Sequence, residues 1–167
     1  MSSFERREAS DSIEIQKASV REQVINELTG ATVTQAQILN LIETQKNYRA
    51  AWRDESYTFQ MRGESHAAEA IQAILNVDNE KEAQDCKLTS KQASEIVYRF
   101  TDSLERQWGK GWGELRGFET AYGEGVKSYY REFVQALGIS ENTMEQVNIT
   151  FWPRRKFRRV GHLTFEV

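Results

Sequence analysis

The chain has 167 residues, of which 39% are hydrophobic and 11% aromatic, and this suits one hydrophobic core and excludes an intrinsically disordered chain. Apolar runs of only a few residues exclude a membrane-spanning helix, and the single Cys86 excludes an intrachain disulfide and a cysteine-based metal cage. The formal net charge is −3, yet residues 151–167 carry five basic and one acidic side chains, against 17 basic and 24 acidic in residues 1–150. We therefore expect a soluble, cytoplasmic protein with an acidic body and a basic tail.

The first helix is expected to follow a polar N-terminal segment. Residues 1–17 are rich in Ser, Glu and Arg, and this composition predicts a flexible N-terminal arm. From residue 18 onward, Val20, Val24 and Leu28 recur at helical spacing before Gly30, which predicts a short amphipathic helix that ends at this glycine. We expect residues 18–167 to form a single helical domain.

The longest predicted helix begins after Thr34, which is a good N-cap residue. Apolar side chains then continue at helical spacing as far as Gly63, and this predicts one helix of about seven turns. The apolar positions are Ile38, Leu41, Ile42, Tyr48, Trp52 and Phe59. The alanine-rich residues 64–76 predict a further helix, and the polar residues 77–87 a surface loop.

Two more helices are predicted in the second half of the chain. Thr89 or Ser90 begins one whose apolar stripe ends before Gly109, and residues 112–137 form another that ends at Gly138. Six glycines lie between positions 109 and 125, at a cost of about 1 kcal/mol each inside a helix. We expect the regular apolar period to outweigh this cost. The glycines expected to admit a neighbouring helix are Gly113, Gly117 and Gly123.

The C-terminal segment predicts β-structure. Ser140 begins a short turn or helix, and then residues 148–152 and 158–167 alternate β-branched or aromatic residues with polar ones, which is typical of strands. The predicted fold class is therefore α+β and predominantly α-helical: a bundle of four to five helices with a C-terminal β-hairpin at about residues 148–167.

Catalytic constellations are sparse in the sequence. His66 and His162 lie on different predicted elements, and Cys86 has no local histidine to activate it. The glycine-rich stretch has neither the spacing of a dinucleotide-binding loop nor the ending of a P-loop. We therefore predict that the protein is not an enzyme, with no catalytic residues, no cofactor and no metal.

The strongest local feature is a cluster of five cations within six positions near the C-terminus, with two aromatic residues beside them. Its members, taken as the predicted binding residues, are Trp152, Arg154, Arg155, Lys156, Phe157, Arg158 and Arg159. Such a cluster suits nucleic-acid phosphates and bases or an acidic protein partner. It is also typical of an exposed strand edge that avoids pairing with other edges.

Three functional hypotheses follow. The leading one is a non-enzymatic protein–protein interaction or regulatory module, since Trp, Tyr and Arg are abundant and are enriched in binding hot spots; self-association into a homo-oligomer through an exposed aromatic face is related to it. The second is a nucleic-acid-binding accessory protein that uses residues 152–159. The third is a small-ligand binder with an aromatic pocket between helices, lined by Trp52, Trp108, Trp112 and Tyr122.

Overall fold

The computed structural model describes residues 3–102, 116–152, 157–160 and 163–166. Within these ranges the chain forms six α-helices, one short 3-10 helix and two antiparallel two-stranded sheets, so the predominantly helical α+β class is confirmed. The α-helices are α1 (Ser3–Leu28), α2 (Gln35–Arg53), α3 (Phe59–Leu75), α4 (Ser90–Thr101), α6 (Arg116–Ala136) and α7 (Glu141–Phe151). The remaining elements are β1 (Thr32–Val33), η1 (Glu80–Glu82), β2 (Cys86–Lys87), β3 (Phe157–Val160) and β4 (Leu163–Glu166).

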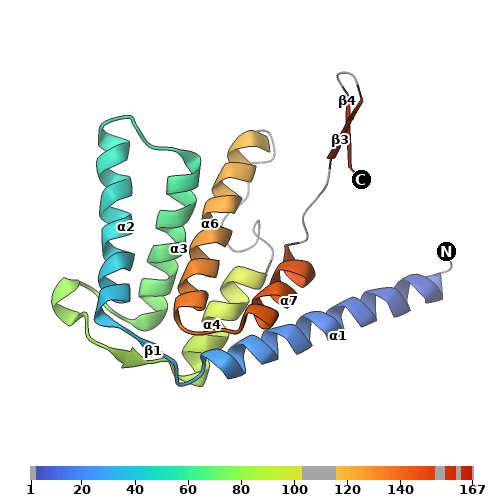
Figure 1. The fold of residues 1–167 in the computed structure, drawn as a ribbon, viewed down its shortest axis with the longest axis horizontal. Helices are drawn as coiled ribbons and strands as arrows, with labels where there is room; N and C mark the ends of the chain where they lie inside the picture. Colours follow the sequence, from blue (N-terminus) through green and yellow to red (C-terminus); the bar gives the residue numbers. More distant parts are fainter. Residues whose placement is uncertain (1–2, 103–115, 153–156, 161–162, 167) are drawn as a thin grey trace.

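Helix α3 is central to the fold. It lies between α2 and α6 and packs against both, while α4 packs against α1 (Figure 1). Helix α1 crosses the base of this group, where its C-terminal half contacts α4 and α7, and its N-terminal half projects beyond them. The two residues of β1 pair with β2 through Thr32 opposite Lys87 and Val33 opposite Cys86. This pairing places a short strand in the predicted loop at residues 77–87.

The core is built from the apolar stripes that the sequence predicts. Val24, Leu28 and Ile38 are fully buried, as helical spacing toward one face requires. Phe100 of α4 stacks on Tyr130 of α6 with ring centroids 4.6 Å apart, so these two helices are joined by aromatic contact. The helix ends predicted at Gly30 and Gly138 are confirmed by the left-handed φ of both residues, 82° and 96°.

The crossing of α3 and α6 depends on two glycines. A Cβ placed on Gly63 would lie 2.1 Å from the backbone oxygen of Tyr122, and one on Gly125 would lie 2.1 Å from the backbone oxygen of Gln60. Each helix therefore rests directly on the backbone of the other, which only glycine permits. Gly125 was not among the glycines expected to admit a helix, and Gly63 lies inside a helix rather than at a helix end. Of the glycines that were expected to do so, Gly113 lies outside the described residues, and close approach at Gly117 and Gly123 stays a prediction.

The predicted long helix over residues 34–63 is wrong. Helix α2 ends at Arg53 because Glu55 adopts a left-handed φ of 57°, and Ser56 N–H donates to the Ala51 carbonyl at 2.9 Å. This six-to-one hydrogen bond with a left-handed residue before it is the Schellman helix ending. Thr58 then caps α3 by accepting from Met61 N–H at 3.1 Å. The apolar residues of α2 and α3 keep the same helical spacing across residues 54–58, so apolar periodicity alone does not reveal the break.

The predicted strand at residues 148–152 is also wrong. Residues 148–151 instead form the end of α7, and Trp152 follows the helix. Helix α7 begins after Ser140, whose side chain accepts a hydrogen bond from Thr143 N–H. Met144 and Val147 are buried at helical spacing, and this outweighs the short alternation after Asn148. The observed hairpin is smaller: β3 and β4 pair from Phe157 opposite Glu166 to Val160 opposite Leu163. The break between the two helices predicted over residues 34–76 lies at residues 54–58 rather than after Gly63. The full helix α7 raises the number of described α-helices to six, above the four to five predicted.

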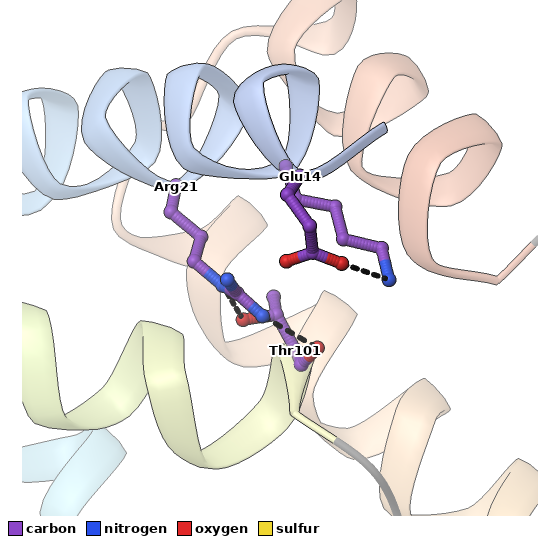
Figure 2. Close-up of polar contacts among 4 residues, drawn as sticks. Glu14, Arg21 and Thr101 are labelled. Carbon is purple, nitrogen blue, oxygen red and sulfur yellow. Dashed lines mark hydrogen bonds and ion pairs between the residues drawn. The ribbon is translucent and has the colours of Figure 1, made fainter. Parts of the chain in front are cut away.

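Helix α1 is longer than expected, since it begins at Ser3 rather than near residue 18. Its attachment to the other helices is centred on Arg21, whose guanidinium donates to the Thr101 hydroxyl at 2.9 Å and the Thr101 carbonyl at 3.2 Å (Figure 2). The same guanidinium lies 4.9 Å from the ring centroid of Tyr98 and 5.0 Å from that of Phe151. Arg21 therefore ties α1 to both α4 and α7. That residues 1–17 form a flexible arm stays a prediction.

Candidate functional site

The predicted basic site lies only partly within the described residues. Arg154, Arg155 and Lys156 fall outside them, and Phe157, Arg158 and Arg159 are described by backbone alone, as members of β3. In the hairpin register, Arg158 lies opposite Phe165 and Arg159 opposite Thr164. Binding of nucleic acid or protein by residues 152–159 therefore stays a prediction.

Trp152, the remaining member of that site, follows the last residue of α7 and packs against the core. Its ring meets the Tyr130 ring edge to face at 5.6 Å, and the Arg131 guanidinium lies 5.7 Å from its centroid. Through these contacts the Trp152 ring packs the end of α7 against α6. The structure thus gives Trp152 a packing role, independent of any role in binding.

Among the residues whose exposure the structure describes, the most exposed aromatic group lies where α2 turns into α3. We call Tyr48, Trp52, Tyr57 and Phe59 the aromatic corner. Trp52 is 60% exposed and Phe59 38% exposed, although both occupy the apolar stripe that the sequence predicts to be core. The Tyr57 ring meets the Tyr48 ring at 6.0 Å and the Phe59 ring at 6.3 Å, both edge to face. The half-buried Tyr57 therefore packs directly against Phe59, and the half-buried Tyr48 packs against Tyr57.

The Schellman ending of α2 creates this exposure. Because the chain reverses at residues 54–58, Trp52 stays on the outer end of α2 and Phe59 begins the next helix. A hollow of about 550 Å³ opens beside the turn, lined by Glu55, Tyr57, Thr58, Phe59, Gln60 and Ala121. The aromatic corner thus combines an exposed indole with a shallow cavity.

Charges of both signs lie beside the aromatic corner: Asp54 and Glu55 are exposed in the turn, and the last turns of α2 carry two arginines. Arg49 and Arg53 are both exposed, and positions 49, 52 and 53 share one helical face. Neither arginine has an ion pair with the part of the chain that the structure describes. The face therefore presents two cations around Trp52.

A second pocket lies between α3 and α4. It has a volume of about 410 Å³ and is lined by His66, Glu69, Ala70, Ala73, Ile74 and Arg99. The His66 Nδ1 atom contacts the hydroxyl of buried Tyr122, whose ring lies 5.3 Å from the imidazole. Ionisable side chains from α3, α4 and α6 therefore converge here, and no feature of the sequence pattern indicated this.

The electrostatics of this pocket keep both ring groups neutral. Burial lowers the pKa of His66, and the positive charge of Arg62 lowers it further, while Glu69 acts in the opposite direction. Burial raises the pKa of Tyr122 to about 12, despite the opposing effect of Arg62 and Arg99. At neutral pH the pair is thus an uncharged imidazole beside a protonated phenol.

A third pocket, of about 300 Å³, lies between α2 and α6. The Tyr129 hydroxyl crosses it and donates to Asn40 Oδ1 at 2.9 Å. Its lining is otherwise mostly apolar or amide, so it carries less chemistry than the pocket at His66. Neither Trp52 nor Tyr122 lines any of these three pockets. Trp108 and Trp112 lie outside the described residues, so the aromatic pocket expected from the sequence stays a prediction.

Other reactive groups are few among the described residues. Burial and the charge of Asp85 raise the pKa of the Cys86 thiol, so the thiol is protonated at neutral pH. Within the described ranges no three His, Cys, Asp or Glu side chains gather as metal ligands. No described helix is both long and apolar enough to cross a membrane.

Comparisons with known protein families, curated proteins and solved structures found no match to this chain. The candidate sites are therefore argued from their own geometry. Sequence reasoning missed the aromatic corner because it assigned Trp52 and Phe59 to a core stripe. The available signal was Thr58, a good N-cap residue directly before Phe59.

Proposed function

We propose that the chain is a non-enzymatic protein-interaction module whose aromatic corner binds an acidic protein partner. The observation that carries this proposal is the 60% exposure of Trp52 at the corner between α2 and α3. A large apolar ring left in water at a fixed position gains free energy when a partner covers it.

The composition of the corner supports the proposal. Tryptophan, tyrosine and arginine are the residues most enriched at binding hot spots. Tyr57 meets Phe59 edge to face and is itself packed against Tyr48, so little side-chain entropy of Phe59 is lost when a partner binds. The adjacent hollow can receive one apolar side chain of the partner.

The charge of the corner indicates the chemistry of the partner. Exposed Arg49 and Arg53 flank Trp52 on α2, and a partner with carboxylates around one apolar side chain would complement both. Such charges mainly accelerate association and select the partner. The ring of Trp52 supplies most of the affinity.

The test is an affinity measurement with the partner recovered on the full chain from the cells that produce it. Changing both Trp52 and Phe59 to alanine should weaken binding about 30-fold or more, as expected for loss of a hot spot. Changing Arg49 and Arg53 to glutamate should slow association and remove most of its salt dependence.

The matched control is Ile149→Ala, which removes another exposed apolar side chain, 56% exposed, on α7. This variant should bind as the wild type does. Equal affinity of the wild type and the Trp52→Ala/Phe59→Ala variant would overturn the proposal, provided that both melt at similar temperatures.

A further inference from the structure

The register of the C-terminal hairpin gives it one apolar face. Residues directly opposite each other in an antiparallel pair share a face, and successive residues of a strand alternate between the two faces. Val160 lies opposite Leu163 and Arg158 lies opposite Phe165. These four positions therefore share one face of the hairpin, and three of them are apolar.

Two strands are too few to make this face stable. Each strand of the hairpin packs chiefly against the other, and Figure 1 shows β3 and β4 apart from the helices. An isolated two-stranded hairpin is only marginally stable in water, whereas three or more strands with an apolar face can be stable. Both β3 and β4 are edge strands within the described ranges, and an edge strand can pair with a further strand. We therefore expect another strand to complete this sheet.

The two edges of the hairpin differ in charge. Strand β3 carries the consecutive residues Arg158 and Arg159, whereas β4 has no charged residue before Glu166. Pairing of β3 with β3 of a second copy would place arginine opposite arginine in each antiparallel register centred on these two residues, and like charges opposite each other are destabilising. The charge distribution therefore favours β4 as the edge that accepts a further strand.

We infer that β4 pairs antiparallel with β4 of a second copy of this chain, with Thr164 opposite Thr164 on a two-fold axis. In this register Leu163 of one copy lies opposite Phe165 of the other, so the apolar faces of both hairpins join into one face of a four-stranded sheet. A shift by one residue would place the apolar face of one copy beside the opposite face of the other. The β3 strands become the outer strands, and their arginines oppose addition of further copies, so assembly ends at a dimer.

Sedimentation equilibrium of the full chain over a range of concentrations tests this assembly. The wild type should show a reversible equilibrium between monomer and dimer. Thr164→Lys places two ammonium groups opposite each other at the two-fold axis, so the dissociation constant of the dimer should rise about fivefold or more. The difference should shrink at high salt. The matched control Thr164→Val keeps a β-branched, uncharged side chain and should dimerise as the wild type does.

Disulfide cross-linking locates the contact in the full chain. Both cysteine variants also carry Cys86→Ser, which removes the only native thiol. Thr164→Cys should form a disulfide-linked dimer on mild oxidation, because Cα atoms opposite each other in adjacent antiparallel strands lie about 4.5–5.5 Å apart. The matched control is Arg159→Cys, opposite Thr164 in the hairpin but on the outer strand. Its two copies would lie three strand spacings apart, about 14 Å, so no linked dimer should form.

The pairing does not involve the aromatic corner, so these experiments are independent of the proposed function. The inference is overturned if the wild type stays monomeric at every concentration, or if Thr164→Lys dimerises as tightly as the wild type. Equal cross-linking of Arg159→Cys and Thr164→Cys would also overturn it. Growth of the wild type beyond a dimer would do the same, since the β3 edge would then pair as well.

Discussion

The α3–α6 crossing and the aromatic corner distribute large and small residues in opposite ways. At the crossing, Gly63 and Gly125 are buried against backbone, whereas at the corner Trp52 and Phe59 stand in water. Both regions include residues of α3. The difference shows that residue size alone does not decide what is buried here: the α3–α6 crossing requires positions without a side chain, and two of the large rings remain exposed.

The largest expected effect tests the crossing. Gly63→Ala places a Cβ 2.1 Å from the Tyr122 backbone oxygen, and backbone cannot rotate away as a side chain can. The helices must separate, and we expect the free energy of unfolding to fall by about 3 kcal/mol, more than the roughly 1 kcal/mol that alanine gains in a helix. Urea denaturation measures this change.

The matched control for that experiment is Glu124→Ala, beside Gly125 on the same helix and exposed, with an expected change within about 0.5 kcal/mol. Gly125→Ala should reproduce the Gly63→Ala result. If Gly63→Ala were as stable as the wild type, the crossing could not be as close as described.

The next largest effect on the free energy of unfolding is expected at the attachment of α1, because one long polar side chain, Arg21, joins α1 to α4 and α7. Arg21→Ala removes two hydrogen bonds to Thr101 and the contacts with the Tyr98 and Phe151 rings. We expect a loss of about 2 kcal/mol in the free energy of unfolding. Arg21→Lys, which keeps the charge but not the planar fork, should lose an intermediate amount; no loss in either variant would contradict the role given to Arg21.

Acid sensitivity of the junction between α1 and α7 is a smaller effect. Burial alone would raise the pKa of Glu27, but hydrogen bonds from Thr143 and Ser140 bring it below the ordinary 4.5. A lowered pKa in the folded state stabilises the fold above the unfolded-state value, and this contribution disappears as the pH falls through the folded-state value. Glu27→Gln should therefore cost about 0.5 kcal/mol at neutral pH, because the group is exposed.

The same variant should match the wild type at an acidic pH below the lowered pKa of Glu27, where the carboxyl group is protonated in both the folded and the unfolded state. Glu22→Gln, an exposed position on the same helix, serves as the control in urea titrations at both pH values. A Glu27→Gln cost that stays constant between the two would show that the charge of Glu27 does not act on α7.

The smallest expected effect is at the aromatic corner. Trp52→Ala should change the free energy of unfolding by no more than about 0.5 kcal/mol, because most of the ring is already in water. Thermal melting beside Gly63→Ala gives the direct contrast. A loss of about 3 kcal/mol, as expected for a buried ring, would place Trp52 in the core and remove the basis of the proposed function.

Local signals allowed much of the fold to be predicted. Thr34, Thr89 and Ser140 act as helix caps, and Gly30 and Gly138 end their helices with left-handed backbone. The break at Glu55 could not be read from apolar spacing, since a residue other than glycine adopts the left-handed conformation there. Burial of Met144 and Val147 likewise favours the helix α7, although residues 148–152 have the propensity of a strand.

The candidate sites were harder to predict than the fold. The aromatic corner follows from the missed helix break, and the pocket at His66 needs Arg99 of α4 and Tyr122 of α6 brought to α3. Such convergence arises from helix packing and leaves no spacing motif in the sequence. The basic cluster, by contrast, is contiguous and therefore visible, but the structure describes no side chain of its five cations.

The account is tested most directly by placing a photo-crosslinking residue at Arg53, next to Trp52 of the aromatic corner, in the full chain and irradiating it in the cells that produce the protein. The same residue at Ile149 on α7 serves as the reference. We predict one discrete adduct with an acidic protein from position 53, lost when Trp52 is changed to alanine, and none from position 149. An adduct from position 149 alone, or none from position 53, would contradict the account.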